Sequence, residues 1–180
     1  MMEELSLNIL DVAENSVAAG ASLVEIEISE NTKANILGII ISDDGCGMTK
    51  EQVAQVCDPF YTARTTRKVG LGVPFFKMAA ELSGGSFIIN SVPGLGTEVR
   101  AVFQLDHIDR MPLGDMTATI LTLIQGSPEI DFMYTHNIDE KTMVMDTRVF
   151  RAILEGVPLS EPEVLAFIRN FMEENMAAIK

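Results

Sequence analysis

The sequence predicts an α+β fold in which helices cover one face of a mixed sheet. Helical and strand-like apolar patterns follow one another along the first part of the chain, and the strand-like segments come in adjacent pairs. Strands that are neighbours in sequence favour this class over the strict alternation of a parallel α/β sheet. Apolar residues make up 47% of the 180 residues, which is enough to bury a sizeable core.

A helix is expected over residues 4–19, where apolar side chains recur at three- and four-residue steps and Gly20 is placed to end it. Residues 24–28 alternate apolar and acidic side chains, which predicts a half-exposed strand. The aliphatic run 36–41 predicts a strand buried on both faces, with Asp43 just after its end.

Thr49 and Gln52 have the spacing of a capping box and predict a short helix. The stretch 58–69 has no periodicity, so we expect a mobile loop there. The remaining elements of the first part are a helix over 72–82 and paired strands at 87–90 and 99–105.

The rest of the chain predicts a smaller unit with helices and a hairpin. In order, we expect a helix over 113–124, a hairpin of 132–135 and 142–145, a short helix over 147–154, and a last helix capped by Ser160 and Glu163. Pro112 lies near the boundary, so the predicted division is 1–106 and 107–180. The alternative is that the second part packs on the first without a linker.

The formal charge of −13 disfavours nucleic acid as a partner, because phosphates would be repelled. The dense basic run of Arg64, Arg67 and Lys68 is too short to offset this negative charge along a DNA duplex. No apolar run reaches the roughly 18 residues of a spanning helix, and the first residues lack the basic start of a signal peptide. We therefore expect a cytoplasmic protein that does not enter a membrane, with Cys46 and Cys57 as free thiols.

Three glycine loops, a carboxylate and a helical amide together predict a nucleotide pocket. Asp43 would offer its carboxylate to an amine, and Gly45 and Gly47 would allow close approach and positive φ. Gly70 and Gly72 precede a helix, whose free N–H groups attract phosphate.

Each of these features also has an ordinary structural explanation. Asn15 lies one helical turn after Asp11 and offers a neutral amide oxygen that suits magnesium, yet alone it is more often a surface residue. Asp43 alone is more often a turn residue, and Gly94 with Gly96 is equally well a hairpin turn.

The order and spacing of the motifs resemble those of the GHKL ATPases, and the resemblance spans roughly residues 4–105. The first two boxes, similar to the N box of the DNA mismatch-repair branch and the first glycine box, lie at 11–22 and 43–48. The later boxes, similar to those of sensor histidine kinases, lie at 58–62, 70–73 and 94–97.

The resemblance implies a Bergerat fold that holds ATP and Mg²⁺ between helices and a mixed sheet. It implies that Asn15 coordinates magnesium and that Asp43 accepts from the adenine amine, with Thr97 supporting it through water. The base would be flanked by Gly45 and Gly47, and Met48 is a further candidate for contact with the nucleotide.

The same resemblance implies a lid over the nucleotide at residues 58–71. The phosphates would be bordered by Gly70 and Gly72, and Leu71 between them is a further candidate for contact with the nucleotide. The candidates for contact with the phosphates inside the lid are Thr62, Arg64, Arg67 and Lys68. A cation there would approach the γ-phosphate.

Asp11 departs from the family pattern, because several branches carry Glu at this position as the general base. The aspartate carboxylate is one methylene shorter, and one helical turn still places it beside Asn15. Asn8, a turn earlier, is expected on the helix surface or in support, and Glu14 is expected to be structural.

Comparison with the branches of the GHKL ATPases leaves two possible functions. No histidine precedes Asp11, and we expect His107 and His136 to be surface or packing residues, so autophosphorylation would need a histidine from a partner. The first function is a kinase that acts on a serine or histidine of a separate partner protein. The second is an ATP-dependent conformational switch with slow hydrolysis. In both, residues 107–180 would bind a partner or form a homodimer.

Overall fold

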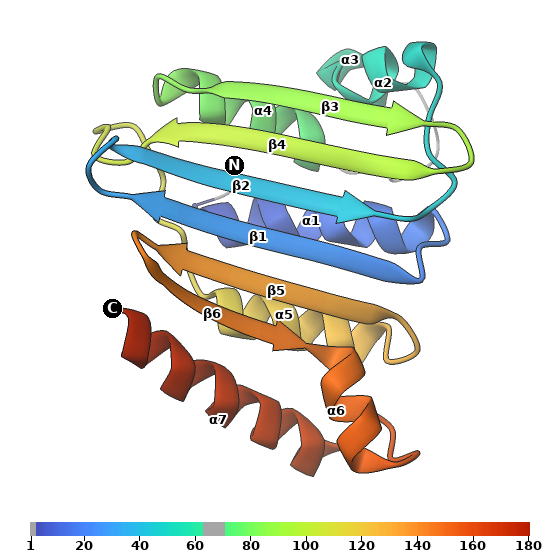
Figure 1. Ribbon diagram of the computed structural model, residues 1–180. Helices are drawn as coiled ribbons and strands as arrows, with labels where there is room; N and C mark the ends of the chain where they lie inside the picture. The colour runs from blue at the N-terminus through green and yellow to red at the C-terminus, as the bar shows by residue number, and fades with distance from the viewer. Residues whose placement is uncertain (1–2, 63–70) are drawn as a thin grey trace.

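A computed structural model describes residues 3–62 and 71–180 (Figure 1). The elements in chain order are α1 (Leu5–Ala18), β1 (Leu23–Asn31), β2 (Ile36–Asp43), α2 (Lys50–Val56), α3 (Pro59–Thr62), α4 (Gly72–Leu82), β3 (Ser86–Val92), β4 (Gly96–Gln104), α5 (Met116–Gly126), β5 (Asp131–Ile138), β6 (Lys141–Asp146), α6 (Thr147–Leu154) and α7 (Pro162–Ile179).

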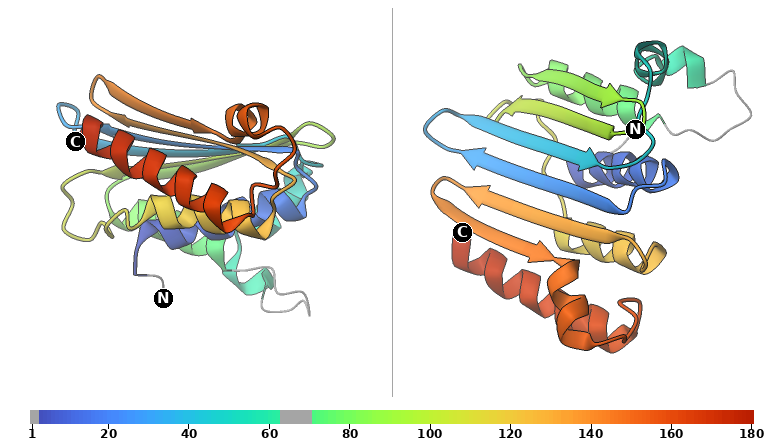
Figure 2. Two further views of the ribbon diagram at one scale, coloured as in Figure 1. Left: turned by 90° about the horizontal axis from the view of Figure 1, so that it is seen from below. Right: turned by 45° about the vertical axis from the view of Figure 1, so that its right-hand side comes forward.

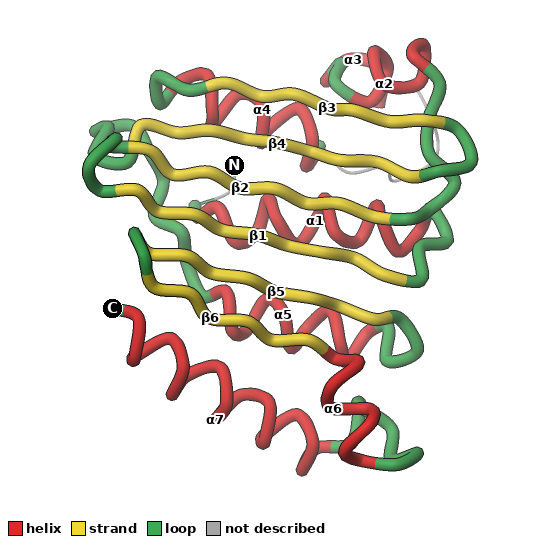
Figure 3. Tube along the Cα trace, in the orientation of Figure 1, coloured by secondary structure: helices red, strands yellow, loops and turns green. Residues whose placement is uncertain are grey.

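The strands form one six-stranded sheet in the order β3-β4-β2-β1-β5-β6. All neighbouring strands run antiparallel except β1 and β5, which are parallel, as the arrows of Figure 1 show. The strands are the yellow segments of Figure 3. The α+β prediction with a mixed sheet is therefore confirmed. The capping box at Thr49 is also confirmed, with Gln52 as its partner at the start of α2.

Helices α1, α4 and α5 cover one face of the sheet, and α7 runs beside the β6 edge (Figure 2). Alternate side chains of the strands bury against these helices, as Val24, Ile26 and Ile28 do on β1. The opposite face is open, and Ile36 on β2 is 42% exposed there. The prediction that β2 is buried on both faces was wrong, because the helices lie on one side of the sheet only.

Residues 107–180 add two strands to the same sheet. Strand β5 pairs with β1 from Leu23 opposite Asp131 to Glu30 opposite Ile138. Helix α5 packs against α1, and α7 packs against α5 and β6. The two predicted parts thus share one sheet and one core. Their division into a domain of residues 1–106 and an extension of residues 107–180 stays a prediction.

Three boundaries differ from expectation for local reasons. Helix α5 begins at Met116, because the Asp115 side chain accepts from Ala118 N at 2.9 Å and caps it there. Glu161 precedes α7 without a side-chain cap, so the predicted Ser160 cap was wrong. The short helix α3 begins inside the stretch expected to be a loop. Within the described ranges, no helix is both long and apolar enough to cross a bilayer.

A buried polar chain joins β1 to β5. The Tyr134 hydroxyl lies 2.7 Å from His136 Nδ1, and His136 Nε2 lies 2.9 Å from a Glu30 carboxylate oxygen. Burial raises the pKa of Tyr134 far above its ordinary value, so the phenol keeps its proton. The hydrogen bond with His136 holds the pKa of Glu30 below its usual range. His136 is therefore a packing residue with both ring nitrogens paired.

Replacing Tyr134 with phenylalanine should destabilise the fold by about 1–3 kcal/mol, because His136 Nδ1 would stay buried without a partner. Urea unfolding at neutral pH measures this loss. Thr142→Val is the control, since it removes an exposed hydrogen bond to Asn137 and should change stability by less than about 0.5 kcal/mol. Equal losses in the two variants would contradict the role given to the buried chain.

Candidate functional site

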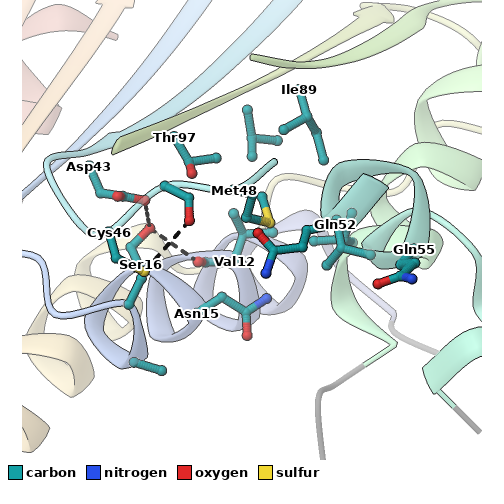
Figure 4. A pocket seen from close by; sticks show the side chains of 16 residues that line it. Val12, Asn15, Ser16, Asp43, Cys46, Met48, Gln52, Gln55, Ile89 and Thr97 are labelled. Atoms are coloured by element: carbon teal, nitrogen blue, oxygen red, sulfur yellow. Dashed lines mark hydrogen bonds between the residues drawn. The ribbon is translucent and has the colours of Figure 1, made fainter. Parts of the chain in front are cut away.

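A cavity of about 420 Å³ lies beside the end of β2, between α1 and α2 (Figure 4). Its walls come from α1, β2, the loop 44–49, α2, the start of α4, and strands β3 and β4. The cavity therefore lies where the covered face of the sheet meets three helices. Five predicted site residues line it: Asn15, Asp43, Gly47, Met48 and Thr97.

Asp43 is the last residue of β2, and both of its carboxylate oxygens are held. One oxygen accepts from Ser16 Oγ of α1 at 2.7 Å, and the other accepts from Gly45 N at 2.9 Å. These bonds connect helix, strand and loop at one point. The carboxylate is fixed at the cavity wall with lone pairs left for a further donor.

Thr97 lies directly opposite Asp43 in the pairing of β4 with β2. Its hydroxyl is 2.7 Å from Ser91 Oγ, which also accepts from Met48 N at 2.7 Å. The hydroxyls of Thr97 and Ser91 thus connect the β3–β4 hairpin to the loop that follows Asp43. One end of the cavity is polar as a result.

The glycines after Asp43 serve two different purposes. Gly47 has a φ of 70°, and a β-carbon on it would lie 2.0 Å from the carbonyl oxygen of Val92. Gly45 lacks a positive φ, so that part of its prediction was wrong. It is needed for close approach, since a β-carbon there would lie 2.9 Å from the carbonyl oxygen of Ala19.

Asp44, next to Asp43, has a structural role and does not line the cavity. Its carboxylate accepts from Ser22 Oγ, from Ser22 N at 2.8 Å and from Leu23 N at 3.0 Å, where β1 begins. These hydrogen bonds, led by the one from the Ser22 side chain, lower the pKa of Asp44. Of the two neighbouring acids, Asp43 lines the cavity and Asp44 holds the start of β1.

Helix α1 carries a polar stripe toward α4. Asn15 lines the cavity on the side away from Thr97 (Figure 4). Asp11, one turn earlier, lies against Gly72 at the start of α4, where an added β-carbon would come within 2.6 Å of Asp11 Cβ. Burial raises the pKa of Asp11. Asn8 is fully buried, so of its two predicted places the helix surface was wrong and a supporting position is left.

The other predicted site residues do not line the cavity or lie outside the described residues. Asp11, Gly45 and Gly72 are adjacent to the lining residues, and Leu71 is 40% exposed before α4. Outside the described residues are Arg64, Arg67, Lys68 and Gly70. Thr62 ends α3, and its side chain is not described.

Sequence reasoning missed several residues of the cavity wall. Gln52 and Gln55 reach it from α2, where the pattern indicated only a helix start. Ser16 follows Asn15 in the motif, and its bond to Asp43 depends on how α1 crosses the sheet. The apolar wall is made by Val12, Val56, Val73, Ile89 and Val99. These side chains come together only in three dimensions.

Residues 1–107 match the protein family described as histidine kinase-, DNA gyrase B- and HSP90-like ATPase. The sensor protein SrrB of Staphylococcus aureus is 37% identical over 101 residues, which cover 53% of this chain and 17% of SrrB. The non-motile and phage-resistance protein of Caulobacter vibrioides is 27% identical over 123 residues, which cover 65% of this chain and 15% of that protein. The chain spans less than a fifth of these relatives.

A solved structure supports the fold. The N-terminal domain of a DNA repair protein superposes with a TM-score of 0.51 at 17% identity, over 81% of this chain and 53% of that one. At this identity the likeness concerns the fold alone.

Gly47→Ala should cost about 3 kcal/mol or more of stability, because the new β-carbon meets both a positive φ and the Val92 carbonyl. Gly94→Ala is the matched control, with a φ of 80° and open space around it, and should cost only about 1–2 kcal/mol. Thermal and urea unfolding of the two variants measure the difference. Equal costs would mean that backbone approach at Gly47 does not constrain the loop.

Proposed function

Because the chain belongs to the histidine kinase-, DNA gyrase B- and HSP90-like ATPase family, we propose that the cavity beside β2 binds ATP with Mg²⁺ for phosphotransfer to a separate partner protein. The observation that carries the proposal is the fixed carboxylate of Asp43, held by Ser16 and Gly45 at the cavity wall. The acceptor on the partner would be a serine or a histidine.

The cavity suits a nucleotide in size and in the chemistry of its walls. A volume of about 420 Å³ is within the ordinary range for small-molecule sites. Asp43 would accept a hydrogen bond from the adenine amine, and the Thr97 hydroxyl would support it through water. Met48, Val73 and Ile89 offer apolar surface to the faces of the base.

Asn15 would hold Mg²⁺ through its amide oxygen, which is a hard, neutral ligand. The ion would neutralise charge on the phosphate oxygens when it is bound. Residues 70–72 would border the phosphates, since α4 begins at Gly72 and presents free backbone N–H groups there.

Asp11 would act as the general base. Its raised pKa makes the carboxylate a better proton acceptor at neutral pH, and one helical turn separates it from Asn15. In phosphotransfer it would take the proton of the incoming hydroxyl or imidazole as the new bond to the γ-phosphorus forms. The bond from that phosphorus to the β–γ bridging oxygen would break, and ADP would leave.

A second candidate function is an ATP-dependent switch with slow hydrolysis, and the sheet favours it. Asp44, beside Asp43, is bonded to Ser22 and Leu23 at the start of β1. Strand β1 in turn pairs with β5 of residues 107–180. A change at the nucleotide would therefore reach this C-terminal part through one strand, where a partner or a second copy could bind.

Asp43→Asn should weaken ATP binding by about tenfold or more, because an amide replaces a charged acceptor that also holds Ser16 and Gly45. Isothermal titration calorimetry measures the affinity. Asp44→Asn is the matched control, since it changes the neighbouring acid outside the cavity and should keep the affinity within about twofold. Wild-type affinity in Asp43→Asn would rule out the adenine role.

Phosphotransfer and switching predict different results with γ-labelled ATP and a cell extract. The kinase should label a partner protein, and Asp11→Ala should remove nearly all of that label by taking away the base, for which a factor of about 10²–10⁴ is typical. ATP-dependent capture of a partner without label would support the switch instead. If the Asp11→Ala variant labels the partner protein as fully as the wild type does, another residue must be the base.

A further inference from the structure

We propose that Asn8 is a positioning residue for Asp11. In this proposal the Asn8 side-chain amide donates to one buried water molecule, which donates in turn to the Asp11 carboxylate and orients it toward the nucleotide site. The inference rests on the proposed role of Asp11 as the base and adds a residue that acts through it.

Asn8 is a buried polar side chain without a partner. It is 0% exposed, and neither its amide nitrogen nor its amide oxygen makes a hydrogen bond. Among the residues that the structure describes, these are the only buried side-chain polar atoms in that condition. Burial of an unpaired amide costs free energy that a leucine side chain of the same branched shape would not cost. A role besides packing would explain its presence.

Asp11 is the complementary group. It lies three residues after Asn8 on α1, a spacing that makes two side chains neighbours on one helix face. Burial raises the pKa of its carboxyl, and no hydrogen bond within the described ranges opposes that effect. A donor and an acceptor, both without partners, are thus one helical turn apart.

The site also restricts where the Asp11 carboxylate can turn. Its Cβ and Oδ2 lie against Gly72, where an added β-carbon would come within 2.6 and 3.0 Å of them. A donor on the opposite side, toward the start of α1, would hold the carboxylate in one orientation. Asn8 is neutral, so it can donate without the strong lowering of the pKa that a lysine would cause. A bridging water would use the amide oxygen or nitrogen and the carboxylate as its partners.

Three forms of the full chain separate positioning from packing: wild type, Asn8→Leu and Asn8→Ser. Asn8→Leu removes the donor and keeps the branched shape and the number of side-chain heavy atoms, whereas Asn8→Ser keeps a donor and leaves a small cavity. Turnover of ATP should fall in the order wild type, Ser, Leu, with a loss of about 10–100-fold for Leu, as for other residues that orient a reacting group. Stability should rank in another order, with Leu at or above wild type and Ser lowest. ATP affinity should stay within about twofold, so that the effect is on kcat.

The proposal is overturned if turnover follows the stability order, or if Asn8→Leu turns over ATP within twofold of wild type. A high-resolution crystal structure of the wild-type protein tests it without any activity. Asn8 Nδ2 should bond one water molecule that also bonds the Asp11 carboxylate, and contact with carbon atoms alone would overturn the proposal. The crystal structure could show that bond while the wild-type protein fails to turn over ATP. That result would refute the role of Asp11 as the base and leave the positioning contact established.

Discussion

The carboxylate of Asp43 must be held at the end of β2 while a helix and a loop converge on it, and the rest of the site depends on this constraint. Its two hydrogen bonds fix Ser16 on α1 and Gly45 in the following loop. Because α1 is thereby set relative to the sheet, Asn15 and Asp11 are set as well. The glycines permit the close approach, so the geometry of the pocket follows from one anchored acid.

The location of each acidic side chain decides whether it stabilises the fold or belongs to the candidate site. Asp44 is saturated by three donors at the start of β1, and Glu30 is paired with His136 at the other end of that strand. Both have lowered pKa values because they accept hydrogen bonds. Asp11 differs, since burial raises its pKa. The half-buried Asp11 thus differs from the two hydrogen-bonded acids in the direction of its pKa shift.

Much of the fold and the polar end of the site could be predicted from local signals. The end of α1 near Gly20, the cap at Thr49 and the place of Asp43 at the end of β2 each depend on neighbouring residues. The rest could not be predicted, because it depends on distant contacts. The burial of Asn8 depends on how other elements pack on α1, and the open face of β2 depends on which side the helices take. The pairing of β5 with β1 has no local signature, since parallel neighbours are joined only through a long crossover.

The parallel pairing of β1 with β5 also bears on how the chain reaches its fold. Strand β1 forms a hairpin with β2 early in the sequence, yet its other edge is satisfied only by residues 131–138. Until those residues have been synthesised, a nascent chain presents a row of unpaired amide and carbonyl groups beside a buried apolar strand. Such late, long-range closure slows folding and leaves the intermediate open to pairing with other chains. The order of the strands therefore makes closure of the sheet at β1 a late step, which waits for residues 131–138.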